Sequence, residues 1–356
     1  MSLKHGHSSF YIMAIGAALL FGASAPLIKL MLNSMEPVML AGILYMGSGI
    51  GMALVKAFQR TGNTRTSEAS LGRGDISWLL AALVVGGITA PIILMFGIDN
   101  TPASTAALLL NFEAVGTVLI ARLMFREQVG RGVWMALFLI TLGSILLSIN
   151  STDGWGLSLG ALTVLAACFL WGLDNNLTRN ISAKDPIMIV TIKGLGAGLF
   201  SIALAIAIGN DFPELSVIVI ALFIGFLCYG LSLFLYIRAL RGLGAARTGA
   251  LFGTAPFSGG LLGLLIFHDS ITIWLIVALP LLIFGTILMF KEAHEHSHKH
   301  TAESHEHRHA HDDRHHDHSH EGPEPKYSHS HFHSHGEVKH EHHHMPDIHH
   351  RHEHKK

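Results

Sequence analysis

The sequence predicts an all-α integral membrane protein with ten transmembrane helices, built as two inverted halves of five and followed by a disordered tail. Three observations support this fold class. Apolar runs recur along residues 10–290, Lys and Arg occur in only every second connection, and short motifs occur twice in the same order. Only 14% of the 356 residues are charged, whereas 50% are hydrophobic. Soluble domains are about one-quarter charged, so this composition argues against a soluble enzyme.

The chain consists of two parts that differ in composition. Residues 294–356 hold 24 of the 27 histidines, and aliphatic residues are nearly absent from them. The formal net charge of the whole chain is −1, which argues against nucleic acid as a partner. We divide the chain into a cytoplasmic N-terminus at 1–9, a first half at 10–149, a second half at 150–290 and a tail at 291–356.

The apolar runs have the length of membrane-spanning helices. Crossing about 30 Å of hydrocarbon takes roughly 20 mostly apolar residues. Runs near this length occupy residues 10–32, 36–57, 76–98, 103–121, 132–149, 157–178, 186–208, 215–237, 248–267 and 272–290. The lipid bilayer is therefore the first expected partner of the chain.

The basic residues of the connections predict the orientation. Connections after the second, fourth, sixth and eighth runs contain Lys or Arg, and the five alternate connections contain neither. Loops rich in Lys and Arg stay in the cytoplasm. We therefore expect a multi-pass protein of the plasma or inner cell membrane with both termini in the cytoplasm.

The two halves share a set of short motifs. Because each half has five runs, the second half enters the membrane from the opposite side. Inverted repeats of this kind are typical of secondary transporters, whose sites lie near the bilayer midplane. The matching pairs are Phe21-Gly22 with Trp171-Gly172, Glu36-Pro37 with Asp185-Pro186, Gly47-x-Gly49 with Gly196-x-Gly198, Arg126-Glu127 with His268-Asp269, and Gly143–Leu146 with Gly285–Leu288.

These motifs, together with Pro26, the segment Ala106–Val115, Lys193 and Pro256, carry a family resemblance. Residues 10–290 resemble the ten-helix, EamA-type permeases of the drug/metabolite transporter superfamily. The resemblance implies a transporter that is not an enzyme, needs no cofactor and moves a small molecule or an ion. It leaves open the substrate, the coupling ion and whether the chain forms a homodimer.

The sequence departs from the family pattern at three places. Glu113 is followed by Ala114 where the family usually has Glu-Pro, and Ala255 replaces the acid before Pro256. The basic residue early in the second span of each repeat is present as Lys193, whereas the first half has Leu44 there. If this basic residue serves transport, the protein therefore has it in one of the two repeats and not in both.

Glu113 is the ionisable residue that we expect to lie deepest in the membrane, because its position in the fourth apolar run is close to the bilayer centre. Ionisable groups in hydrocarbon are costly unless they are paired or hydrated, so each is a functional candidate. A carboxyl group that takes up a proton facing one side and releases it facing the other would suit proton coupling. A protonated Glu113 that donates a structural hydrogen bond between helices explains the residue equally well.

A second candidate group lies toward the cytoplasmic side. Asp174, Asn175 and Asn176 end the sixth run, and Lys193 lies at a similar depth in the seventh. A salt bridge between Asp174 and Lys193 is therefore feasible, either as a fixed pair or as one that a charged substrate opens. Pro256 is a further candidate, because a proline can free a backbone carbonyl to line a cavity.

The tail predicts metal binding. Neutral imidazole suits Ni, Cu and Zn, and alternate residues of an extended chain face the same side, so we expect the tail to bind Ni, Zn or Co. With few apolar groups the tail cannot bury a core, so we expect disorder without metal. The candidate ligands are His294, His296, His298, His300, His305, His307, His309, His311, His315, His316, His318, His320, His329, His331, His333 and His335.

The sequence leaves two transport functions open, and a third class, a non-transporting metal sensor whose bundle is only an anchor, is less favoured than either. In the first, the bundle exports a small metabolite, and the tail senses or buffers Ni, Zn or Co. In the second, the bundle exports a divalent metal ion that the tail collects at the cytoplasmic mouth. Glu113 stands nearly alone at the midplane, whereas a metal pathway needs several ligands, so the first function is favoured.

Overall fold

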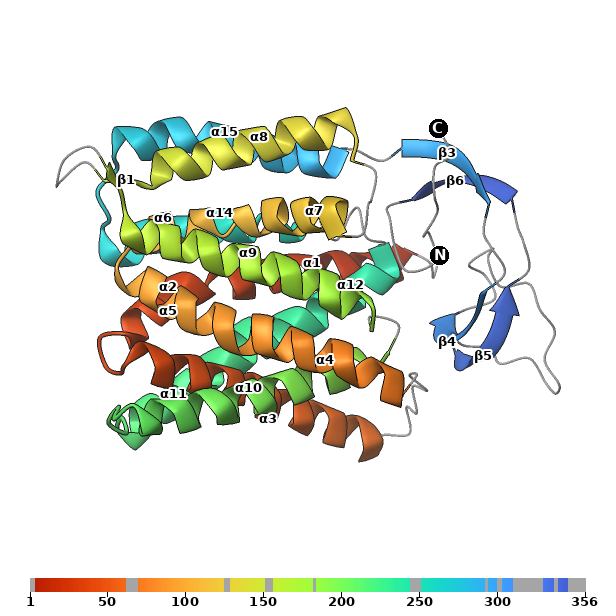
Figure 1. The fold of residues 1–356 in the computed structure, drawn as a ribbon, viewed down its shortest axis with the longest axis horizontal. Helices are drawn as coiled ribbons and strands as arrows, with labels where there is room; N and C mark the ends of the chain where they lie inside the picture. Colours follow the sequence, from red (N-terminus) through yellow and green to blue (C-terminus); the bar gives the residue numbers. More distant parts are fainter. Residues whose placement is uncertain are drawn as a thin grey trace.

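The structure is a computed structural model that describes residues 4–61, 70–124, 129–150, 156–181, 184–243 and 251–291 of the apolar part. It also describes four segments of the tail, at 294–299, 303–309, 329–335 and 339–344. The described apolar part is helical apart from one two-residue strand pair, and its helices run side by side along one common direction (Figure 1).

The first half contains straight helices and interrupted ones. Three of its apolar runs are interrupted within the bundle, and each interruption exposes backbone groups that need other partners. The elements are α1 (Lys4–Gly22), α2 (Ser24–Met31), α3 (Pro37–Thr61), the short turn η1 (Arg73–Asp75), α4 (Ile76–Ala82), the π-helical turn η2 (Leu83–Thr89), α5 (Ala90–Asp99), α6 (Ala103–Leu109), α7 (Phe112–Met124) and α8 (Arg131–Leu147).

The second half follows a two-residue pairing of β1 (Ile149–Asn150) with β2 (Gly156–Leu157). Asp185 begins one of its helices as an N-cap, because its Oδ1 accepts from the backbone N–H of Ile187, and Pro186 suits the first turn. The elements are α9 (Leu159–Arg179), α10 (Pro186–Ala207), α11 (Leu215–Gly225), the π-helical turn η3 (Phe226–Leu231), α12 (Ser232–Leu243), α14 (Ala255–Phe267) and α15 (Ile273–Lys291).

The irregular stretches occupy matching places in the two halves. η2 interrupts the third apolar run of the first half, and η3 interrupts the third run of the second half. A turn at Leu110 and Asn111 divides α6 from α7, and a turn at 253–254 precedes α14 in the corresponding run. The repeated motifs are therefore accompanied by repeated departures from regular helix.

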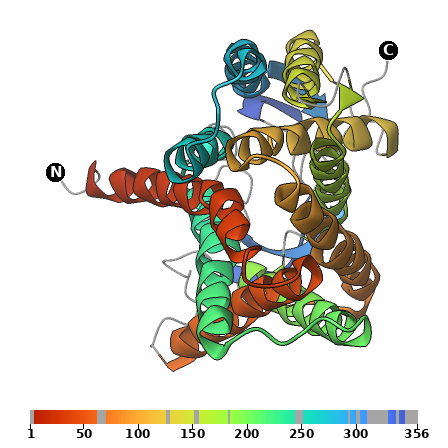
Figure 2. The same cartoon turned by 90° about the vertical axis from the view of Figure 1, so that its left-hand side faces the viewer.

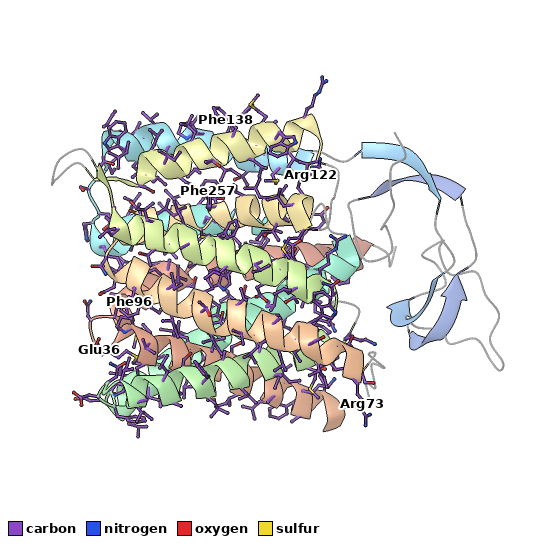
Figure 3. All side chains as sticks on the ribbon, viewed as in Figure 1. Glu36, Arg73, Phe96, Arg122, Phe138 and Phe257 are labelled. Carbon is purple, nitrogen blue, oxygen red and sulfur yellow. The ribbon has the colours of Figure 1, made fainter. Side chains whose placement is uncertain are left out.

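Six segments are long and apolar enough to cross a membrane: Ser9–Met31, Pro37–Gln59, Arg73–Asp99, Ala103–Met124, Pro186–Ala207 and Leu215–Ala239. Three of the other predicted runs form shorter apolar helices, Arg131–Leu147, Ala255–Phe267 and Ile273–Met289. The remaining run is α9, whose last two turns contain Asp174, Asn175 and Asn176. Large apolar side chains face outward around the bundle, as lipid contact requires, and Phe138 is 61% exposed (Figure 3).

The two halves interlock instead of forming separate lobes. α10 packs along α3, α15 along α8 and α14 along α6, so each of these pairs joins the two halves. α1 contacts α12 and α14 of the second half, while α9 contacts α5 and α7 of the first. Figure 2, which looks along the helices, shows how elements distant in the chain alternate around the bundle.

Glycines allow the closest of these contacts. A Cβ atom on Gly194 of α10 would lie 2.6 Å from the backbone nitrogen of Gly49 on α3. A Cβ atom on Gly49 would in turn lie 2.5 Å from the backbone nitrogen of Leu195. Small residues let helix backbones approach in this way inside a membrane.

The described tail segments differ from the disorder that the composition predicts. β3 (His294–Lys299) pairs antiparallel with β6 (Lys339–His344), and β4 (Glu303–His309) pairs antiparallel with β5 (His329–His335). Alternating His-x-His sequences match the two-residue period of an extended chain. Two-stranded ribbons are only marginally stable by themselves, so these pairings do not form a core.

We predict that Gly194→Val weakens the packing of α3 on α10. Overpacking a close contact costs about 1–3 kcal/mol, so the variant should show a lower Tm in detergent and a smaller monodisperse fraction. Gly74→Val is the control, because no atom lies within 4 Å of a Cβ at Gly74. Equal Tm values for the two variants would contradict the close contact.

Candidate functional site

Glu113 lies in the first turn of α7, directly after the interruption of its span. The turn is held by bonds from the N–H of Glu113 to the carbonyl of Leu110 (3.1 Å) and from Asn111 Nδ2 to the carbonyl of Leu108 (3.0 Å). This interruption places a helix N-terminus near the middle of the span Ala103–Met124. The positive end of the α7 dipole favours a negative charge on Glu113.

The Glu113 carboxylate bonds to the other half of the chain. Asn175 Nδ2 of α9 donates to Glu113 Oε1 at 2.8 Å and to Thr117 Oγ1 at 3.2 Å. Asn176 Nδ2 donates to the carbonyl of Thr117 at 3.0 Å and to that of Gly172 at 2.8 Å. The two asparagines therefore join α9 to α7. Among the ion pairs of the described residues, none involves Glu113.

Asp174 and Lys193 form an ion pair between α9 and α10. Lys193 Nζ lies 2.6 Å from Asp174 Oδ1 and 2.7 Å from Oδ2, and Thr178 Oγ1 donates to Oδ1 at 3.0 Å. The side chains are only 16% (Lys193) and 11% (Asp174) exposed. The geometry agrees with the salt bridge that their sequence depths suggest, while its role stays a prediction.

The π-helical turn η2 supplies a backbone acceptor to this site. The carbonyl of Gly86 accepts from Tyr45 OH at 3.0 Å and from Trp171 Nε1 at 3.1 Å. Asp174 packs directly against Gly86, and a Cβ atom there would collide with the Asp174 carboxyl group. Glycine at position 86 is therefore required for the fit of Asp174, and its backbone carbonyl fixes the positions of two aromatic rings.

The two rings bonded to this carbonyl contact two further rings, and we call the four the aromatic cluster: Phe21, Tyr45, Trp171 and Tyr229. The Tyr45 and Tyr229 ring centroids are 5.5 Å apart, and the Tyr229 ring meets Phe21 edge-on at 6.4 Å. Phe21 lies 6.5 Å from Trp171. These contacts form a closed ring, because Tyr45 and Trp171 are also joined through the carbonyl of Gly86. The ring contains residues of both halves.

Further polar links hold the ends of the bundle. At one end, Lys29 Nζ donates to the carbonyl of Ile98 at 2.7 Å, and Asp269 Oδ2 accepts from the N–H of Ser104 at 2.9 Å. At the other end, Lys56 pairs with Asp185 at 2.5 Å. These links connect segments that are distant in the chain.

The structure brings together most, but not all, of the predicted site residues. Glu113, Asp174, Asn175, Asn176 and Lys193 are joined through α7, α9 and α10. Pro256 is instead buried at the start of α14, and no contact described for the structure joins it to Glu113 or to the ion pair.

Sequence reasoning missed Lys29, Tyr45, Gly86 and Tyr229. A single lysine inside the apolar run Ser9–Met31 is a signal for Lys29. Tyr45, Gly86 and Tyr229 carry no such signal, because their importance comes from the π-helical turns.

The predicted tail ligands are only partly within the described residues. His294, His296 and His298 lie in β3, His305, His307 and His309 in β4, and His329, His331, His333 and His335 in β5. His300, His311, His315, His316, His318 and His320 lie outside the described segments. In the helical part, among the residues whose side chains the structure describes, no three His, Cys, Asp or Glu side chains come together in a way that could hold a metal ion; the tail side chains lie outside this description.

The fold and the polar centre define a multi-pass helical membrane protein with ionisable groups inside its bundle. The EamA-like transporter family matches residues 8–149 and again residues 158–291. The chain therefore belongs to the EamA-like transporter family, and the protein is a membrane transporter. The two matches correspond closely to the two halves that the sequence motifs predict.

Two relatives agree with this family. An uncharacterized transporter of Methanothermobacter thermautotrophicus is 30% identical over 297 residues, which cover 79% of this chain and 85% of that protein. An uncharacterized transporter of Clostridium kluyveri is 21% identical over 236 residues, covering 64% and 76%. A solved crystal structure shares the fold with a TM-score of 0.57 at 17% identity, covering 79% of this chain and 95% of the solved one.

We predict that Asp174→Asn destabilises the protein far more than removal of a peripheral ion pair. An unpaired buried Lys193 would cost about 3–5 kcal/mol, so Tm in detergent should fall clearly. Adding Lys193→Met should restore much of the loss. Lys184→Met is the control, since the Lys184 ammonium lies 3.8 Å from Asp75, which is too far for a hydrogen bond, so loss of this looser pair should lower Tm less. A Tm for Asp174→Asn equal to that of Lys184→Met would argue against a buried pair.

Proposed function

We propose that the protein is a secondary active exporter of a small organic metabolite, with its site at Glu113, Asn175 and the Asp174–Lys193 pair. The observation that carries this proposal is the bond between Asn175 and Glu113. Glu113 belongs to the first half and Asn175 to the second, so this bond joins the two halves. The Glu113 carboxylate has no ion-pair partner among the described residues. In transporters built from repeats, sites of this kind lie where the repeats meet.

Glu113 carries the proposed coupling step. Its carboxyl group takes up a proton from one side of the membrane and releases it to the other, while substrate moves in the opposite direction. The Asn175 amide can donate to the ionised carboxylate, and its own carbonyl can accept from the protonated form. The same partner can therefore serve both protonation states of Glu113.

The ion pair carries the proposed conformational step. α9 holds Asp174 and Asn175, and it packs on α5 and α7 of the first half while Lys193 projects from α10. A shift of α9 therefore changes the bonds to Glu113 and to Lys193 together. The Asp174–Lys193 pair is proposed to open when substrate engages the site.

The tail is proposed to bind Ni, Zn or Co and to sense or buffer these ions. Its support is the density of alternating imidazoles, which suit these metals. Export of the metal itself is the second candidate. Within the described residues of the bundle no group of three metal-ligating side chains occurs, and this supports an organic substrate instead.

Both termini are proposed to lie in the cytoplasm. Arg73 and Arg122 lie at the end of the bundle nearest the tail, whereas Glu36 and Phe96 lie at the opposite end (Figure 3). Basic residues concentrated at one end favour a cytoplasmic location of that end.

We predict opposite labelling of two single cysteines by a membrane-impermeant maleimide. Ser34→Cys, at the Glu36 end, should react in intact cells, whereas Ser70→Cys, at the Arg73 end, should react only after permeabilisation. Both serines are exposed. The native Cys168 and Cys228 are buried, so the parent protein should give a low background. The reverse labelling pattern would overturn the orientation.

We predict that Glu113→Gln and removal of the tail have different effects. Cells expressing the intact chain should enrich the medium in a small organic metabolite, and Glu113→Gln should abolish this enrichment because the carboxyl can no longer release a proton. Truncation after Lys291 should instead change metal tolerance and cell-associated metal in a Ni, Co and Zn series. Glu36→Gln, which alters an exposed acid at the far end, is the matched control.

One outcome reverses the choice of substrate. If the intact chain lowers cell-associated metal and Glu113→Gln abolishes this effect, the bundle exports the metal. If neither metabolites nor metals respond to Glu113→Gln, the site is not the transport site.

A further inference from the structure

The net charge at the centre of the bundle limits what it can bind. Asp174 and Lys193 neutralise each other through two short contacts, at 2.6 and 2.7 Å. Glu113 then remains as a carboxylate that meets an amide and no cation among the described residues. The site therefore presents one net negative charge when Glu113 is ionised.

The rings beside this charge present apolar faces. Trp171 and Tyr45 both direct their polar groups to the carbonyl of Gly86, which fixes the orientation of each ring. Phe21 and Tyr229 complete the aromatic cluster. Because the hydrogen-bonding groups of Trp171 and Tyr45 are already used, these two rings can contribute mainly their π faces to a ligand.

A second aromatic pair contacts the aromatic cluster through Phe21. Tyr236 of α12 lies 4.7 Å from Phe252, and Phe252 lies 5.3 Å from Phe21. On α9, Trp171 lies one helical turn before Asn175, the residue that bonds to Glu113. The aromatic cluster therefore adjoins the carboxylate through α9.

Part of this site is not covered by protein atoms. Asn175 is exposed although it bonds to Glu113, and Glu113 and Tyr45 are half-buried. The Tyr229 hydroxyl is buried and has no hydrogen-bond partner among the described residues. A fully packed hydrophobic core would leave these side chains inaccessible. The site is therefore a partly open arrangement of one carboxylate and several ring faces.

We propose that this site selects a singly charged organic cation that carries a flat apolar group. The inference rests on the proposed transport function and names its substrate class. The cationic head would lie between the Glu113 carboxylate and the ring faces of the aromatic cluster, where a cation–π contact is worth about 0.5–2 kcal/mol. An organic anion is disfavoured, because the nearby cation Lys193 is held by Asp174.

The test compares three probes of matched shape on the purified full-length chain. Benzyltrimethylammonium is the cation, neopentylbenzene its neutral counterpart and benzenesulfonate the anion, with binding measured by equilibrium dialysis at pH 8. We expect the cation to bind at least tenfold more tightly than either other probe. Equal binding of the three, or preference for the anion, would overturn the proposal without any mutation.

Two variants assign the binding to the site. Glu113→Gln keeps the shape and the amide bonding capacity but removes the charge, so cation affinity should fall at least tenfold. Trp171→Leu removes a ring face and should also weaken cation binding, while Glu36→Gln should leave the affinity unchanged. Unaltered cation binding by a folded, monodisperse Glu113→Gln protein would overturn the assignment.

A transport measurement separates the two proposals. If proteoliposomes move a neutral or anionic metabolite in a Glu113-dependent manner and the cation does not bind, the substrate class is wrong and the transport function stands. If the cation binds with the expected Glu113 dependence but never crosses the membrane, the binding site stands and the transport function fails.

Discussion

Inside a bilayer no water is available to bond a free carbonyl or amide group, so the protein itself must satisfy every interruption of a helix. This constraint explains the centre of the molecule. The π-helical turn η2 frees the carbonyl of Gly86, and the side chains of Tyr45 and Trp171 occupy it at 3.0 and 3.1 Å. The turn before α7 is closed by Asn111, whose amide bonds to Leu108. These two irregular stretches thus fix polar or aromatic side chains at the middle of the bundle.

These local solutions depend on the way in which the halves interlock. Tyr45 belongs to the first half and Trp171 to the second, yet both bond to the same carbonyl. Glu113 and Asn175 are likewise contributed by different halves. The central residues therefore share one interface, and α9 connects most of them because it contains Trp171, Asp174, Asn175 and Asn176. A movement of α9 would therefore change the bonds to both Glu113 and Lys193.

The sequence predicts the parts of this arrangement that depend on hydropathy and residue type. Apolar runs locate the helices, and the cost of charge in hydrocarbon singles out Glu113, Asp174 and Lys193. The sequence does not reveal η2 or η3, because an extra residue in a helical turn is set by packing partners distant in the chain. Lys29 does carry a sequence signal, as the single lysine of the apolar run Ser9–Met31, but its partner does not, since the bond to the carbonyl of Ile98 depends on where α5 ends. In the tail, composition alone predicted disorder, whereas the two-residue alternation also suits the paired strands β3–β6 and β4–β5.

The contacts of α1 also have a consequence for how the chain is made. α1 leaves the ribosome before the other helices of the bundle, yet its partners α12 and α14 belong to the end of the bundle. About 210 residues separate Gly22 from Ser232, so synthesis at about 5–20 residues per second leaves α1 without them for roughly 10–40 s. During this interval Phe21 and Gly22 must face lipid or a membrane chaperone. The same interlocking of the halves that forms the central site therefore makes the nascent chain depend on the insertion machinery until its last helices have been synthesised.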